Sequence, residues 1–286
     1  MGVTKALDGG AIWGANQVTT STTVTATVAN GAAVLTNYPV SNLKNPLRTK
    51  TTRVTYDDTD DTFDIVFDFG AAVSVTAIAF VDWNVPNSSN LVKIYADADN
   101  TSWDGPRWDI FPYQGDNGVA RYYLDTASSG TAISSARYWK IAFSGDYSIV
   151  ESYLEIGEIV FASYIDVDIS TPFGRTVQNP STYATSYGGQ EYVDEKNFFN
   201  AIALNTTPMN STSLYTLQNS IAAVGSAHTI LDVHAADAGI GDTASSTQGI
   251  LNLASTYYGR LHKGIKTSIK GFNNSTLSLS FGEARK

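Results

Sequence analysis

Aromatic side chains in one long polar loop are the strongest functional signal of this sequence. Trp103, Trp108 and Tyr113 fall within NTSWDGPRWDIFPYQGDNG, and Asn84 stands where another strand leaves its sheet. Aromatic faces stack on sugar rings or anchor protein interfaces, while Asn84 and Asp104 could orient a ligand by hydrogen bonds. We therefore predict a ligand site built from these five residues. The alternative is that such rings fill the ends of the fold.

The acidic residues of a second loop could bind a hard cation. Asp57, Asp58, Asp60 and Asp61 stand close together, and Ca²⁺ takes several carboxylate and carbonyl oxygens as ligands. The loop lacks the glycine turn and the distal glutamate of an EF-hand. We predict a solvated loop and no metal site, and the calcium alternative remains open.

Two histidines flank an aspartate in HTILDVH. His228, Asp232 and His234 would share one face of a strand, because side chains alternate across a strand. Their spacing matches no common zinc motif, and His262 stands far away in the sequence. We interpret them as hydrogen-bonded strand residues and not as metal ligands.

Signatures of catalysis are missing from the sequence. It contains no cysteine, no G-x-S-x-G elbow and no glycine-rich phosphate loop. Carboxylate pairs such as Glu155 with Glu158 could serve glycoside hydrolysis, but alternating acids are common on strand surfaces. We predict that the protein is not an enzyme and binds no cofactor.

The composition is typical of a β protein with many turns. Only 16% of the 286 residues are charged, and the 43% that are hydrophobic occur in short pieces. The net charge of -9 argues against nucleic acid as a partner. The basic stretch Arg260 to Lys270 is interpreted as the wet side of strands. No apolar run approaches the ~20 residues of a membrane span, and Met1 to Gly14 lacks the regions of a secretory signal.

Short strands separated by turns dominate the chain from Tyr38 to Phe161. Ile65, Phe67 and Phe69 share one face of a strand that ends at Gly70. The near-continuous apolar run from Val73 to Val81 predicts a strand buried on both faces. This pattern indicates a β-sandwich or jelly roll.

The chain after this region indicates a second, mixed and mostly β unit with one helix. Ser211 or Thr212 is the expected N-cap, and Gly225 ends the helix. Its apolar stripe is expected to comprise Leu214, Leu217, Ile221 and Val224. The predicted domains are residues 1–37, a Thr-rich N-terminal arm or outer strand, residues 38–162, a β-sandwich, and residues 163–286, the mixed unit.

The stretch from Ala136 to Val160, ARYWKIAFSGDYSIVESYLEIGEIV, resembles part of a discoidin-like, galactose-binding-type jelly roll. The segments NYPVSNLKNP, DTFDIVFDFGAAVSVTAIAFVDWNV and NLVKIYADADNTSWDGP add to this resemblance. It implies a fold that displays loops for binding. Some modules of this type hold a structural Ca²⁺, which keeps the cation alternative alive.

The whole chain from Tyr38 to Arg285 also resembles a type of tailed-bacteriophage virion protein. The second β unit, the Tyr258-Gly259-Arg260 step and the ending SLSFGEAR carry this resemblance. It implies a non-enzymatic structural or adaptor protein of the tail, baseplate or fibre-attachment region, located in the virion and assembled in the host cytoplasm.

The partners implied are other virion proteins, copies of the same chain and a host-surface glycan, without nucleic acid or membrane insertion. The N-terminal arm could pair with the sheet edge of another chain. The alternative function is a carbohydrate-binding module of a bacterial surface or polysaccharide-degrading system. A third possibility is a glycan-processing enzyme, which needs carboxylates that converge in one cleft.

Overall fold

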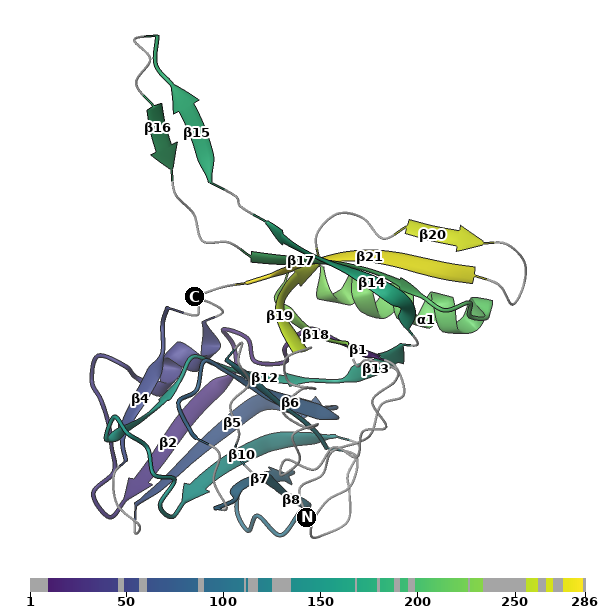
Figure 1. Cartoon of the computed structure of the whole chain (residues 1–286). Coiled ribbons are helices and arrows are strands. Elements are labelled where there is room, and N and C mark those ends of the chain that lie inside the picture. Colours follow the sequence, from purple (N-terminus) through teal and green to yellow (C-terminus); the bar gives the residue numbers. More distant parts are fainter. Residues whose placement is uncertain are drawn as a thin grey trace.

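Antiparallel strands build almost all of the chain in its computed structural model, which confirms the mainly β fold class (Figure 1). One α-helix and one short 3-10 helix, Val40–Lys44, complete the described elements. The structure describes residues 10–45, 49–56, 61–86, 90–110, 112, 118–124, 135–167, 169–178, 181–187, 191–194, 199–225, 227–233, 256–261, 266–269 and 275–284.

A sandwich of three sheets forms the first half of the molecule. The largest sheet has five strands in the order β2-β5-β10-β7-β8, and two three-stranded sheets have the orders β11-β4-β3 and β12-β6-β9. Their strands are β2 (Thr23–Ala29), β3 (Ala33–Val34), β4 (Thr52–Thr55), β5 (Thr62–Val73), β6 (Ala77–Val81), β7 (Val92–Asp97), β8 (Arg107–Ile110), β9 (Val119–Tyr123), β10 (Ala136–Ser144), β11 (Tyr153–Ile156) and β12 (Glu158–Ala162).

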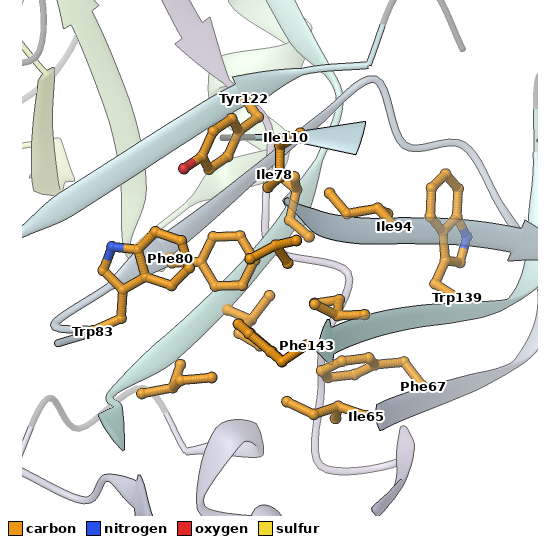
Figure 2. Close-up of a cluster of buried hydrophobic side chains, with 14 of the residues drawn as sticks. Ile65, Phe67, Ile78, Phe80, Trp83, Ile94, Ile110, Tyr122, Trp139 and Phe143 are labelled. Carbon is orange, nitrogen blue, oxygen red and sulfur yellow. The ribbon is translucent and has the colours of Figure 1, made fainter. Parts of the chain in front are cut away.

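The main core lies between the five-stranded sheet and β12-β6-β9. Strand β5 alternates buried and partly exposed residues, so Phe63, Ile65 and Phe67 point inward, as the sequence predicts. The ring of Phe67 meets Phe161 from the opposite sheet at 4.9 Å between centroids. Figure 2 shows Ile65, Phe67, Phe80 and other core side chains converging between the strands.

The boundary between β5 and β6 differs from the prediction. Strand β5 continues through Gly70 to Val73, because this glycine adopts a left-handed φ of 76° that its missing Cβ permits. The doubly buried strand is therefore Ala77–Val81, in which all five residues are buried. The predicted burial on both faces is confirmed for this shorter strand.

A second sheet and the helix form the other half of the molecule. The sheet has the order β13-β1-β18-β19-β21-β17-β14, with β20 also paired to β21, and a separate hairpin consists of β15 and β16. The strands are β1 (Gly10–Trp13), β13 (Tyr164–Val167), β14 (Ile169–Gln178), β15 (Thr182–Thr185), β16 (Glu191–Asp194), β17 (Phe199–Thr206), β18 (Thr229–Val233), β19 (Thr256–Leu261), β20 (Lys266–Ile269) and β21 (Ser275–Glu283).

Helix α1 (Ser211–Val224) packs its apolar stripe on this sheet. The four stripe residues predicted from the sequence are all buried. The N-cap prediction is wrong, because the side-chain oxygen of Asn210 accepts the Ser213 N–H at 2.8 Å and Asn210 itself has extended backbone. The predicted stop at Gly225 is confirmed by its φ of 57°. Within the described residues, no helix is long and apolar enough to cross a membrane.

The Thr-rich N-terminal segment divides between the two halves. Strand β2 is an outer strand of the five-stranded sheet, paired with β5 from Thr23↔Asp68 to Ala29↔Thr62. Strand β1 instead lies inside the second sheet, between β13 and β18. The expectation of an arm that pairs with another chain is wrong for β1, because both of its edges are used within this chain. The first 37 residues therefore complete both predicted domains.

A second apolar layer joins the two halves. Alanines on the outer face of β6 leave room for large rings, and Trp13 meets Tyr123 at 5.9 Å between ring centroids. Buried polar groups lie in the same layer: Glu158 accepts hydrogen bonds from Asn16 and Tyr258, and Arg121 donates to Thr256 at 2.9 Å. The sheet β12-β6-β9 is therefore enclosed on both faces.

Candidate functional site

The structure separates the residues of the predicted ligand site. Trp108 lies in strand β8 and not in a loop; its ring is buried and stacks on Trp139 at 5.7 Å. It cannot meet a ligand in this position, because the alternation of β8 turns it into the core. Tyr113 lies outside the described residues, and Asp104 is exposed in the turn before β8.

Asn84 joins two segments of the sandwich. Its side-chain oxygen accepts the Glu155 N–H at 2.7 Å, and its side-chain nitrogen donates to the Tyr153 carbonyl at 2.8 Å and to Glu151 at 3.3 Å. These bonds hold the end of β6 against β11. They occupy the amide that the sequence analysis assigns to orienting a ligand.

Trp103 is held in a tight turn between β7 and β8. Its backbone has a left-handed φ of 53°, and its N–H donates to Asp97 at 2.9 Å. Gly105 lies so close to β7 that an added Cβ would clash with the Ala96 carbonyl oxygen. The turn therefore lies tightly against the sheet, which fixes the tryptophan at low conformational cost.

The Trp103 ring folds back over the outer face of the five-stranded sheet. It meets Tyr95 of β7 edge to face at 6.4 Å, and the Lys140 amine of β10 lies 4.7 Å from its centroid. The same amine lies 4.6 Å from the Tyr95 ring. Strand register explains this grouping, because Lys140 is directly opposite Tyr95. All three side chains are partly exposed.

Ion pairs frame these rings on the same face. Arg107, opposite Tyr95, contacts both carboxylate oxygens of Asp109 at 2.9 Å. Lys140 lies 3.6 Å from Asp64 of β5. Such pairs fix the direction of donors and acceptors more than they stabilise the fold. We call the surface formed by Tyr95, Trp103, Arg107, Asp109, Lys140 and Asp64 the Trp103 face.

Electrostatics differ between neighbouring groups of this face. Burial raises the pKa of Asp64, and Lys140 partly offsets that rise. Burial also raises the pKa of Tyr95. The pKa of Arg107 is raised mainly by its hydrogen bond to Asp109. Tyr95 and Arg107 therefore keep their protons at neutral pH and remain hydrogen-bond donors.

A second aromatic cluster lies on the small sheet β11-β4-β3. The Arg53 guanidinium is stacked between Tyr38, at 4.2 Å, and Tyr153, at 4.8 Å, and contacts Glu155 at 3.3 Å. The cluster satisfies its own charges and rings. It therefore offers a natural comparison for the Trp103 face.

The predictions about metal ligands are only partly accessible. Asp57, Asp58 and Asp60 lie outside the described residues, while Asp61 is buried and its carbonyl accepts the Tyr56 hydroxyl at 2.9 Å. Across the described part of the chain, no group of three or more His, Cys, Asp or Glu side chains could hold a metal ion.

The histidine pattern shows a local role for one member. His228 accepts a hydrogen bond from Arg260 at 3.1 Å and stacks on Tyr258 at 5.0 Å. His234 and His262 lie outside the described residues.

Comparison with known proteins finds likenesses in structure alone. No family model matches the chain, and no curated protein matches it in sequence. The lectin-binding domain of Lectinolysin complexed with Lewis b is similar over 51% of this chain and 94% of its own, with 12% identity and a TM-score of 0.38.

Two further solved structures are similar over about half of the chain. Chitosan-binding module 1 from a Paenibacillus sp. IK-5 chitosanase/glucanase covers 52% of this chain and 99% of its own, with 17% identity and a TM-score of 0.37. The family 32 carbohydrate-binding module of Clostridium perfringens NanJ, in complex with galactose, covers 54% and 99%, with 16% identity and a TM-score of 0.34.

Proposed function

We propose that this protein is a non-catalytic carbohydrate-binding protein and that the Trp103 face binds the sugar. The observation that carries the proposal is the position of Trp103. Of the five tryptophans, the other four are buried, whereas Trp103 stands partly exposed on a polar sheet face. A fixed aromatic ring beside oriented donors and acceptors is the arrangement that a sugar ring requires, because one side of a sugar is apolar and its rim carries hydroxyl groups.

Each part of the Trp103 face has a role in this proposal. The apolar side of the sugar packs on Trp103, with Tyr95 beside it. Arg107 and Lys140 donate to the hydroxyl groups, and Asp64 and Asp109 accept from them. The site is open and shallow, so we expect an affinity of about millimolar to micromolar per site, or roughly 4–8 kcal/mol. Several copies on one particle or surface would raise the apparent affinity by avidity.

A glycan array probed with the full chain tests this proposal. We expect binding to a defined group of neutral glycans, and Trp103→Ala should weaken it at least tenfold. The matched control is Tyr153→Ala, which removes a partly exposed ring from the Arg53 cluster on another sheet. Loss with the control and retention with Trp103→Ala would move the site to that cluster. Binding to no glycan would refute the proposal.

An adaptor role in a tailed-phage virion is a second proposal, which the sequence resemblance suggests. A projecting hairpin, β15 with β16, supports it, since its tip residue Tyr187 is fully exposed (Figure 1). A protein that only binds sugar has no need of such an extension. Mass spectrometry of purified particles from cells that carry the gene tests this role. We expect the chain among the particle proteins at a fixed copy number, and its absence would refute the role.

A further inference from the structure

The hairpin of β15 and β16 extends the sheet far beyond its own partners. Strands β14 and β17 pair up to Gln178↔Phe199, and the chain then continues into the β15–β16 pair, Thr182↔Asp194 to Thr185↔Glu191. From Gln178 to Tyr187 the chain reaches about 30 Å at ~3.3 Å per residue. Among the described residues, β15 and β16 pair only with each other.

Such a hairpin gains little stability by itself. A two-stranded hairpin is at best marginally stable in water, and here Ala184, Thr185 and Tyr187 are all exposed. A third strand would supply the missing hydrogen bonds and a surface for the exposed tyrosine. A partner that offers a strand edge is therefore the fitting occupant.

Strand β20 offers an edge of this kind. It pairs with β21 from Lys266↔Ser278 to Ile269↔Ser275, and its other edge meets no strand of the described chain. All four of its residues are exposed, with Ile269 72% exposed. An exposed edge is a template for pairing with another chain.

Helix α1 adds an apolar contact beside this edge. Gln218 donates to Thr267 of β20 at 2.6 Å, so this flank of the helix faces the strand. Tyr215 lies one turn before Gln218 on the same flank and is 66% exposed. Ile269 shares the face of Thr267, because residues two apart in a strand point the same way. The strand edge thus has exposed Tyr215 and Ile269 on one side.

Charge decides between the possible occupants of the β20 edge. The segment 260–270 contains Arg260, Lys263, Lys266 and Lys270 and no acidic residue, which disfavours pairing of this edge with its own copy. The hairpin segment 181–198 has the opposite balance, with Glu191, Asp194 and Glu195 against a single lysine. Figure 1 shows the hairpin pointing away from β20 of its own chain.

We propose that the β15–β16 hairpin of one copy of this chain docks on the β20 edge of a second copy. The contact joins two different surfaces, so repetition leads to a closed ring or to a filament. The basic stretch that the sequence analysis assigns to the wet side of strands is, in this proposal, an interface that selects the acidic hairpin.

Sedimentation velocity on the full chain tests the proposal by charge exchange. Wild type should associate as its concentration rises from about 1 to 100 µM, and added salt should weaken the association. Lys266→Glu alone, and the pair Glu191→Lys with Asp194→Lys, should each weaken association about tenfold. The three substitutions together should restore it. Lys50→Glu, an equal charge change at another exposed site, is the control and should have no effect.

Three results would overturn the proposal. One is a wild-type chain that stays monomeric over the whole concentration range. Another is unchanged association in both charge-reversed variants. The third is undiminished association after a short Gly-Ser turn replaces residues 181–195. Thermal unfolding of each variant shows whether it is folded, and the charge exchange remains decisive if the shortened hairpin fails to fold.

Discussion

The two sheets that enclose the main core use opposite sequence patterns. In the five-stranded sheet, strands such as β7 and β10 alternate buried and partly exposed residues, so one face is solvated. In β12-β6-β9 every residue of all three strands is buried. Alternation thus leaves a face for binding, and continuous apolar character joins one half of the molecule to the other.

Polar side chains have different roles in these two sheets. On the five-stranded sheet they form the partly exposed ion pairs of the Trp103 face. In β12-β6-β9 the polar residues Arg121 and Glu158 are buried in the layer that holds the second half. The same chemical groups therefore contribute to recognition in one sheet and to attachment in the other.

The largest expected effect comes from removing a ring at the junction. Trp13→Ala deletes a fully buried side chain beside Tyr123 and should lower the free energy of unfolding by about 3–5 kcal/mol. Trp103→Ala, the matched change on the exposed face, should cost less than about 1 kcal/mol. Urea denaturation of the full chain measures both. Equal losses would contradict the difference between the two sheets.

A smaller loss is expected from the buried carboxylate of the junction. Glu158→Ala leaves the Asn16 amide and the Tyr258 hydroxyl without their acceptor, which should cost about 2–3 kcal/mol. Glu155→Ala is the comparison, since Glu155 forms a partly exposed pair with Arg53 and should cost about 1 kcal/mol or less. Denaturation curves would refute this ranking if Glu155→Ala proved the more damaging.

The smallest effect is a contrast in pH dependence within β5. Arg137 donates two hydrogen bonds to Asp68 and holds its pKa below the ordinary value of about 3.9, whereas burial raises the pKa of Asp64. The stability from Asp68 is complete above that ordinary value and is lost as the pH falls through its lower folded pKa. Asp64 has the opposite sign, because its contribution is lost as the pH rises through its raised pKa.

Carboxyl NMR titration measures both groups in the folded chain. Asp68 should titrate at lower pH than Asp64. In stability measurements, Asp68→Asn should reduce the loss at acidic pH, and Asp64→Asn should reduce the loss on the alkaline side of its transition. A reversed order of titration would show that burial does not dominate at Asp64.

Local patterns predict the elements well and their partners poorly. The apolar stripe of α1 and the inward residues of β5 follow from spacing alone. The place of β1 does not, because GAIW pairs with residues more than 150 positions away. Pairing over such separations depends on the whole fold, which a local pattern does not contain.

The candidate site illustrates the same limit. Trp103 and Trp108 stand five positions apart, yet one lies over the sheet and the other under it. The alternation in Arg107-Trp108-Asp109-Ile110 is a strand signal that could have assigned Trp108 to the core. Tyr95 and Lys140 occupy predicted strands, but only the register of β7 with β10 brings them together.

Acrylamide quenching of tryptophan fluorescence tests the central claim most directly. The other four tryptophans are buried, so in the folded chain the quenchable emission should come from Trp103 and should disappear in Trp103→Phe. If the Trp103 face binds sugar, a glycan selected on the array should protect this emission in proportion to its occupancy. Unchanged quenching at saturating glycan would contradict the account and place the binding site away from Trp103.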